Sequence, residues 1–338
     1  MIRLLPALLA STVTFATGSA MAQNVPVNFT LDWAAQGPHS WFYLAEERGY
    51  FEDEGIDITI DQGEGSAAAV SRVMTGAYDA GFGDINAVIQ AAATEPEDAP
   101  VMVYLVYNRA PFAIISKADG PVQELPDVEG RVIASPAGSA TFRLFPALAE
   151  ANGFDGQNVE VLNAAQNLIE QMLISGDAEA IAQFGATSYM NFIAMGLDPE
   201  TDFNWFFYSD NGLDLYSNGV IVSRAMIEEQ PEVVAGLVRA INRAVLDVVS
   251  EPQAGIDVLM EIEPLNDADL EMQRLQYTID NQLYTDETGE LGIGHLSMDR
   301  LASSIETIAE VYELEAAPEV EAIFDPAFLP PAEERMLP

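Results

Sequence analysis

Residues 27–55 read VNFTLDWAAQGPHSWFYLAEERGYFEDEG, and this stretch decides the fold. Apolar and polar residues alternate from Val27 to Leu31, which predicts a strand with one buried face. Ser40 is a favourable residue to begin a helix and Gly49 a favourable residue to end one. We therefore predict a helix of about two and a half turns from Ser40 to Arg48. Together these elements form one strand–loop–helix unit of an α/β fold.

The loop inside this unit carries Asp32, Trp33 and His39. It lies between the carboxyl end of a strand and the amino end of a helix, where α/β sheets bind ligands. A carboxylate, an indole and an imidazole at this position suit a flat polar molecule. The alternative readings are that Trp33 fills the core and that His39 only holds the loop in place.

Five short motifs in this region carry a family resemblance. They are Leu31-Asp32-Trp33, His39, Tyr43-x-Ala45, Gly49-Tyr50-Phe51 and Gly55-Ile56. The region resembles the opening of the solute-binding proteins of ABC importers, in the nitrate, sulfonate and taurine group. The branch that binds pyrimidine precursors of thiamine is the most similar. The chain departs from that branch at Ala34-Ala35-Gln36, where the branch usually has Thr-Pro-Asn, and this leaves the ligand open.

Strand–helix units recur along the rest of the chain. Loops centred on Asp32, Gly65 and Asp84 each follow a predicted strand, so we expect them to open at the same edge of one parallel sheet. The pattern restarts after Asn108. We predict strands at residues 27–31, 56–60, 79–83, 101–106, 132–134, 159–162, 180–184 and 220–222. Long helices are predicted after Pro231, from 267 to 283 and after Ser297, and they serve packing.

This pattern predicts an α/β fold with two lobes, each a mainly parallel sheet flanked by helices. The first lobe comprises residues 23–108 and 217–338, and the second comprises 109–216. The chain crosses between the lobes twice, and two crossings form a hinge around a cleft that closes on its ligand. The resemblance implies the same architecture, a type II periplasmic binding protein. In the tail, Phe324 and Phe328 are expected to dock on the first lobe.

The first 22 residues are typical of a secretory signal peptide. Arg3 precedes an apolar segment from Leu4 to Ala16, and Ala20-Met21-Ala22 forms a small-x-small cleavage site. We therefore expect cleavage after Ala22 and export to the periplasm. The chain has no cysteine, which excludes disulfides, thiolate nucleophiles and cysteine zinc sites. We expect no metal and no cofactor.

The net charge of −41 restricts the possible partners. Nucleic acid is excluded, because phosphate contacts require clustered Lys and Arg. An anionic ligand also needs guanidinium groups, and the sequence offers only Arg109 and Arg143 near the predicted cleft. The acids expected there disfavour an anion. We therefore expect a neutral or cationic nitrogen heterocycle, with Arg109 as a possible anchor for a polar substituent.

The candidate ligand-binding residues share a position at the predicted cleft. They are Asp32, Trp33, His39, Tyr43, Gly65, Ser66, Asp84, Asn86, Arg109, Gly138, Ser139, Thr141, Tyr189, Asp214 and Tyr216. Several have plainer roles. Asp84 and Ser139 are each well placed to cap a helix, and each tyrosine alone suits the scaffold.

Four functions remain open. The first is a periplasmic binding protein that delivers a small heterocycle to the permease and ATPase of an ABC importer. The second keeps the cleft but binds another aromatic nutrient such as a flavin, or a sulfonate, nitrate or taurine. The third is an enzyme, because fungal pyrimidine synthases resemble the same fold, although their cysteine-rich motif is absent here. The fourth is a sensor that passes its bound state to a membrane partner.

Overall fold

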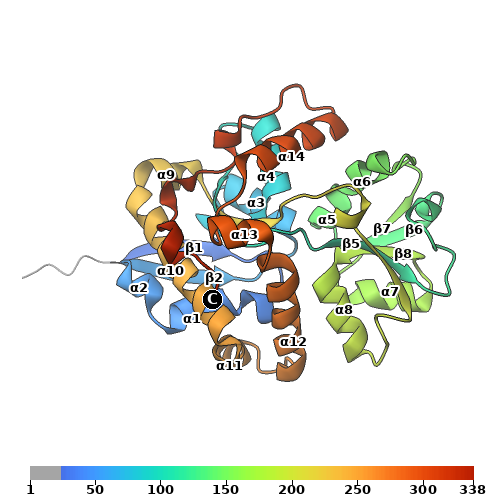
Figure 1. Cartoon of the computed structure of the whole chain (residues 1–338), viewed down its shortest axis with the longest axis horizontal. Coiled ribbons are helices and arrows are strands. Elements are labelled where there is room, and N and C mark those ends of the chain that lie inside the picture. Colours follow the sequence, from blue (N-terminus) through green and yellow to red (C-terminus); the bar gives the residue numbers. More distant parts are fainter. Residues whose placement is uncertain (1–23) are drawn as a thin grey trace, which may run out of the picture.

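The computed structural model describes residues 24–338, so the predicted signal peptide lies outside the described residues. The chain forms two five-stranded sheets, each flanked by helices (Figure 1). We call the parts built on these sheets the first and second lobes. Within the described residues, every helix is too short or too polar to cross a bilayer.

The first sheet has the strand order β2-β1-β3-β10-β4. Its strands are β1 (Val25–Thr30), β2 (Ile56–Asp61), β3 (Ala80–Asp84), β4 (Val101–Leu105) and β10 (Asn218–Val222). Strand β1 pairs in parallel with β2 and β3, whereas β10 is antiparallel to β3 and β4. The loops after β1, β2 and β3 therefore open at one edge of the sheet, as the sequence predicts.

Helices cover both faces of the first sheet. One face packs against α1 (Ser40–Glu47), α2 (Tyr50–Asp53), α10 (Pro231–Ser250) and α11 (Pro252–Ile262). The other face packs against α3 (Ser66–Met74), α4 (Ile85–Thr94) and α14 (Met298–Val311). Three further helices complete the lobe: α9 (Arg224–Glu229), α12 (Ala268–Thr278) with a π-helical turn at Ile279–Leu283, and α13 (Asp286–Leu291). In the tail, Phe324 is buried beside β4, and Phe328 packs on the same lobe.

The second sheet has the order β7-β6-β8-β5-β9. Its strands are β5 (Phe112–Lys117), β6 (Val132–Ser135), β7 (Glu160–Asn163), β8 (Ala180–Phe184) and β9 (Phe203–Phe207), and its helices are α5 (Ala140–Arg143), α6 (Phe145–Ala151), α7 (Ile169–Ser175) and α8 (Gly185–Ala194). The two-sheet α/β architecture is confirmed, but the sequence analysis missed β5 and β9. Strand β5 is antiparallel to β8 and β9, so each sheet is mixed.

A single arginine joins the two segments that connect the lobes. The Arg300 guanidinium donates to the Asn108 carbonyl at 3.1 Å and to Asp214 Oδ1 at 2.8 Å. It also lies 3.9 Å from the ring centroid of Tyr216, whose hydroxyl donates to Glu287 Oε1 at 2.5 Å. Asp214 and Tyr216 therefore belong to a packed hinge.

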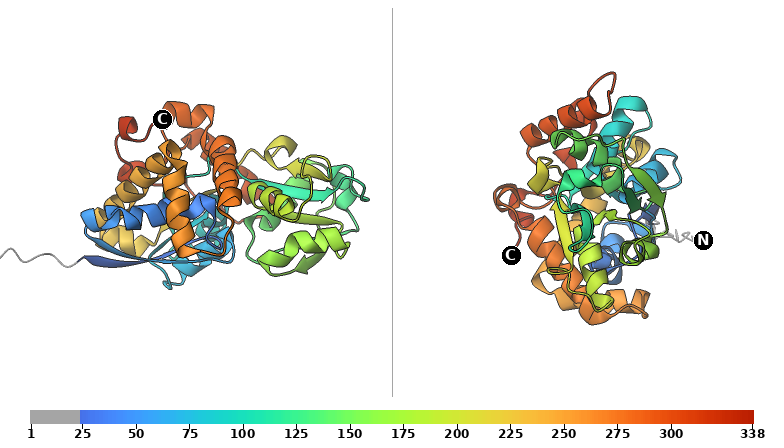
Figure 2. Two further views of the ribbon diagram at one scale, coloured as in Figure 1. Left: turned by 90° about the horizontal axis from the view of Figure 1, so that it is seen from below. Right: turned by 90° about the vertical axis from the view of Figure 1, so that its right-hand side faces the viewer.

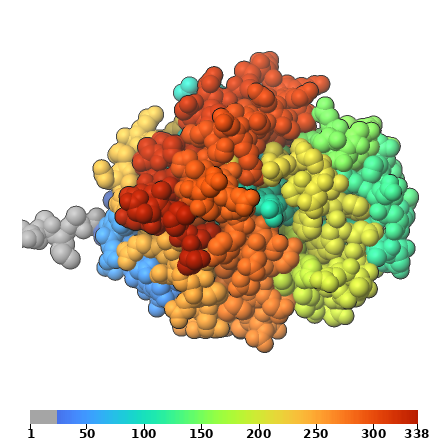
Figure 3. All heavy atoms as spheres, viewed as in Figure 1, coloured from blue at the N-terminus to red at the C-terminus, as the bar shows by residue number. Residues whose placement is uncertain are grey.

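The lobes lie side by side along the long axis of the molecule (Figure 2) and are in contact across the cleft (Figure 3). A Cβ on Gly65 in the first lobe would lie 2.2 Å from the Gly138 carbonyl oxygen in the second. Gln166 of the second lobe also donates to the Gly63 carbonyl at 3.5 Å. The structure therefore represents a closed form.

Candidate ligand-binding site

The loop after β1 builds the first-lobe wall of a cavity between the lobes. Asp32 and His39 are both buried, and His39 Nε2 lies 2.8 Å from Asp32 Oδ1. His39 Nδ1 accepts the backbone N–H of Gln36 at 3.0 Å, so Nε2 carries the proton and donates to Asp32. Asn218 Nδ2 donates to the other carboxylate oxygen at 2.8 Å. The carboxylate is thus fixed, and each oxygen keeps a lone pair for a ligand.

Trp33 and Tyr107 extend this wall. Trp33 is half-buried and lines the cavity. Tyr107 is buried, and its burial raises the pKa of its phenol well above the usual range, with a further rise from the Asp32 charge. Its phenol is therefore neutral at ordinary pH. The wall offers an indole, a neutral phenol and one carboxylate.

The opposite wall joins α12 of the first lobe to α8 of the second. Arg274 donates to the Thr187 carbonyl at 3.1 Å and to Asn191 Oδ1 at 3.3 Å. It also forms two hydrogen bonds with Glu271, of 3.0 and 3.2 Å, and both side chains are at most 5% exposed. Glu271 accepts the Gly37 backbone N–H at 2.7 Å. The buried pair therefore connects the ligand-facing loop to the second lobe.

The cavity that these walls enclose is small. Its volume is about 30 Å³, room for about two water molecules. It is lined by Asp32, Trp33, Gln36, Pro38, His39, Tyr107, Pro111, Ala186, Thr187, Arg274, Thr278 and Gln282. A ring compound does not fit this volume, so the lobes must move apart to admit one.

Five buried polar atoms near this edge lack a hydrogen-bond partner among the described residues. They are Ser66 Oγ, Asn86 Oδ1, Thr141 Oγ1, Gln183 Nε2 and Gln282 Oε1. Buried polar atoms are normally hydrogen-bonded. Gln282 lines the cavity, and the other four lie at strand or helix ends on the cleft side of their sheets. Of the five, only the Gln282 oxygen belongs to a residue that lines the cavity.

Of the predicted site residues, the structure brings Asp32, Trp33 and His39 together at the cavity. Gly65 and Gly138 meet where the lobes touch, with Ser66 beginning α3 beside them. Ser139 precedes α5 and is buried, but its side chain does not cap the helix.

Other predicted residues lie away from the cavity. Tyr43 is buried in the first-lobe core, where burial raises the pKa of its phenol to about 12. Tyr189 packs against Tyr277 of α12, with ring centroids 5.4 Å apart. Arg109 is exposed beside the hinge. Asp214 and Tyr216 form part of the hinge cluster around Arg300.

Sequence reasoning missed Tyr107, Thr187, Arg274 and Gln282. The expectation that only Arg109 and Arg143 approach the cleft was wrong, because Arg274 lines the cavity. Glu271 and Arg274 are spaced i,i+3 in a helix, which in a sequence resembles an ordinary surface ion pair. From the sequence alone, a helix that buries this pair cannot be distinguished from a helix that exposes it, because the difference depends on what packs against the helix.

Gly65 provides a test of lobe contact. Because a Cβ there would meet the Gly138 backbone, we expect Gly65→Ala to keep the lobes apart and to weaken ligand binding. Small-angle X-ray scattering should give a larger radius of gyration than the wild type has with saturating ligand. Gly76→Ala is the matched control, because Gly76 also has a positive φ but nothing within 4 Å of a Cβ. Wild-type compaction and affinity in Gly65→Ala would contradict the closed contact.

Asp84 predicts a pH dependence of stability. It caps α4 by accepting the Ala87 N–H, and burial raises its pKa from 3.8 to about 7 despite hydrogen bonds from Asn86 and Ala87. The folded state therefore holds a proton that the unfolded state has lost between these pH values. Stability falls as pH rises through this window, by up to about 1.4 kcal/mol per pH unit. Asp84→Asn keeps a capping side chain, so urea unfolding at pH 5 and 8 should show a smaller fall than in the wild type. Equal falls in both proteins would contradict the assignment.

Comparison with known proteins gives the family. The profile of the family described as NMT1/THI5 like matches residues 36–255. The formylaminopyrimidine-binding protein of Halalkalibacterium halodurans is 26% identical over 237 residues, covering 69% of each chain. The riboflavin-binding protein RibY of Chloroflexus aurantiacus is 23% identical over 297 residues, covering 86% of this chain and 82% of its own. A 4-amino-5-hydroxymethyl-2-methylpyrimidine phosphate synthase of Aspergillus parasiticus is 22% identical over 249 residues, covering 71% of each chain.

Solved structures give the same fold. The alkanesulfonate-binding protein SsuA from Xanthomonas axonopodis pv. citri superposes with a TM-score of 0.67 at 15% identity, covering 90% of this chain and 100% of its own. The two-lobed periplasmic binding protein fold expected from the sequence is therefore confirmed. At this identity the likeness concerns the fold alone.

Proposed function

The chain belongs to the NMT1/THI5-like family, and from this premise we propose that it captures a small nitrogen heterocycle between its lobes for an ABC importer. The ring lies on Trp33, and Asp32 accepts a hydrogen bond from an exocyclic amino group or a protonated ring nitrogen. Such a charge-assisted bond contributes about 1.5–3 kcal/mol. Gln282 lies on the same lobe as Asp32 and Trp33. Lobe closure then brings Thr187 of the second lobe to the ligand.

The charge at the cavity carries this proposal. Arg274 is the one cation among the described residues that line it, and Glu271 neutralises its guanidinium through two hydrogen bonds. The remaining charge is the Asp32 carboxylate. An anion such as a sulfonate or nitrate would meet a site with net negative charge, whereas an amino-substituted ring would find an acceptor.

A flavin is the second candidate, because RibY aligns over 86% of this chain. A flavin is also a flat nitrogen heterocycle with hydrogen-bonding groups, but its three fused rings need a wider cleft. An enzyme has less support. The resemblance to fungal synthases implies a cysteine-rich motif, and this chain contains no cysteine.

Export to the periplasm and partnership with a permease and ATPase remain part of the proposal, supported by the family and by the binding-protein relatives.

A thermal-shift screen tests the proposed ligand class. We expect 4-aminopyrimidines to raise the melting temperature, with riboflavin, alkanesulfonates and nitrate tested in parallel. A ligand at 100 times its dissociation constant stabilises the folded state by about 2.7 kcal/mol. A shift with riboflavin alone would select the second candidate. A shift with sulfonates or nitrate alone would contradict the charge argument.

A further inference from the structure

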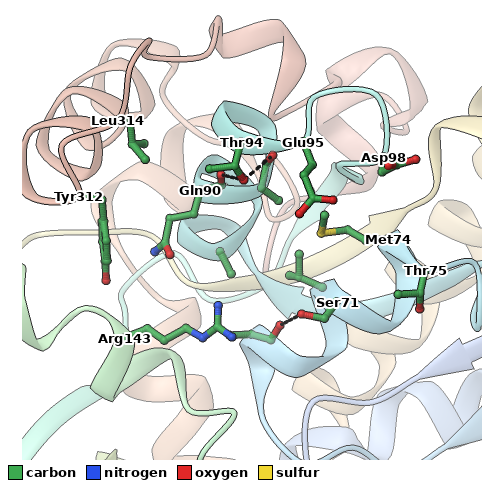
Figure 4. A pocket seen from close by; sticks show the side chains of 14 residues that line it. Ser71, Met74, Thr75, Gln90, Thr94, Glu95, Asp98, Arg143, Tyr312 and Leu314 are labelled. Carbon is green, nitrogen blue, oxygen red and sulfur yellow. Dashed lines mark hydrogen bonds between the residues drawn. The ribbon is translucent and has the colours of Figure 1, made fainter.

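A larger groove lies away from the ligand cavity, between α3 and α4. Its volume is about 610 Å³, within the range of small-molecule sites. Val70 and Met74 of α3 and Ala87 and Ala91 of α4 form an apolar floor. Polar side chains form the rim, and Arg143 of the second lobe completes it (Figure 4). The groove is therefore complete only while the lobes are in contact.

The two ends of the groove have opposite charge. Tyr312, Gln90 and Arg143 lie towards one end, and Glu95 and Asp98 lie beyond the carboxyl end of α4 (Figure 4). The helix dipole of α4 has the same polarity, positive near Arg143 and negative near Glu95. From Gln90 to Thr94, the last residue of α4, the helix rises by about 6 Å, and Glu95 follows directly. An occupant therefore meets a cationic end and an anionic end across a short apolar floor.

The cationic end also has unused hydrogen-bonding capacity. In a chain with 54 acidic residues, Arg109 and Arg143 are the described cationic residues whose side chains form no hydrogen bond or ion pair with described residues. The Tyr312 hydroxyl is buried at the same end of the groove, beside the Gln90 side chain. The Arg143 guanidinium, unpaired among the described residues, suits a carboxylate, and the Tyr312 phenol at the same end can add a hydrogen bond.

We propose that this groove is a second ligand site, for a small zwitterion whose carboxylate and amine are separated by an apolar spacer of about 7 Å. The carboxylate binds Arg143 and Tyr312, the spacer lies on the alanine, valine and methionine floor, and the amine faces Glu95 and Asp98. Because Arg143 comes from the second lobe, an occupant stabilises the closed form. This site does not depend on the ligand proposed for the inter-lobe cavity.

Isothermal titration of the full mature chain with 6-aminohexanoate tests the site. We expect saturable binding that hexanoate and hexylamine, each lacking one charged end, do not reproduce. Arg143→Gln and Glu95→Gln should each weaken 6-aminohexanoate by about tenfold, the effect of losing about 1.4 kcal/mol. Lys117→Gln also removes one positive charge, but from the surface of the second lobe away from the groove, and it should bind as the wild type does.

Two further results would overturn the proposal. The first is no binding by the wild type up to about 10 mM, weaker than any useful site. The second is wild-type affinity in both Arg143→Gln and Glu95→Gln. Trp33→Ala identifies the site that is occupied: unchanged 6-aminohexanoate affinity supports the groove, whereas its loss would assign binding to the inter-lobe cavity. Failure of the heterocycle screen would leave these results unaffected.

Discussion

Arg274→Met is expected to lower the free energy of unfolding by about 3–5 kcal/mol, because it leaves the Glu271 carboxylate buried without its cation. The same change removes the hydrogen bonds to Thr187 and Asn191 of the second lobe. Ligand affinity should therefore fall as well, since closure loses its buried contact between α12 and α8. Urea unfolding followed by circular dichroism measures the first effect, and titration with the best compound of the screen measures the second.

Arg239→Met is the matched control for this variant. Arg239 also makes bidentate hydrogen bonds to a glutamate, Glu54, but its side chain is 42% exposed. Exposed ion pairs contribute about 0–1 kcal/mol, so this change should cost little stability and no ligand affinity. The double variant Arg274→Met with Glu271→Met should recover most of the lost stability, because it leaves no buried charge. If Arg274→Met were as stable as Arg239→Met, the buried Glu271 carboxylate would not depend on Arg274. Unchanged ligand affinity in Arg274→Met would show that the contact between α12 and α8 does not support closure.

Asp32→Asn and Trp33→Ala should separate the two contacts proposed for the ligand. Asp32→Asn is expected to weaken a 4-aminopyrimidine by about tenfold or more, through loss of a charge-assisted hydrogen bond, while a pyrimidine without the amino group changes little. Trp33→Ala should weaken both compounds by about tenfold, because each loses the stacking surface. Titration calorimetry of both compounds against both variants measures the pattern.

Trp33→Phe is the control for stacking, because it keeps an aromatic face, and it should retain most of the affinity. Equal losses of both compounds in Asp32→Asn would mean that the carboxylate supports the loop through His39 and Asn218 and does not contact the amino group. Unchanged affinity in Trp33→Ala would remove the indole from the site.

The parts of the fold that the sequence predicts are those with local signals. Alternation from Val27 to Leu31 and the glycine after Arg48 lie within one or two residues of the observed ends of β1 and α1. Strands β5 and β9 lack such signals. Residues 112–115 are a short apolar run directly after the segment that connects the lobes. A continuous apolar run shows no alternation of apolar and polar residues, so it does not distinguish a strand from a connecting segment.

The candidate site also has a part with a local sequence signal and a part without one. Asp32, Trp33 and His39 are close in sequence, so one loop brings them together and the motif predicts it. Arg274 and Gln282 come from a helix more than two hundred residues later. Their inward direction depends on α12 packing between η1 (Gly37–His39) and α8, which is a tertiary contact without a local sequence signal. Asp84, in contrast, has a local sequence signal, because its position at the start of α4 is that of a helix-capping residue.

The position of a bound ring tests the central claim most directly. A crystal structure of the mature protein with a 4-aminopyrimidine should place the ring between the lobes, stacked on Trp33, with its amino group within hydrogen-bond distance of Asp32. A ring bound elsewhere, or a Trp33 side chain turned away from it into the protein core, would contradict the account.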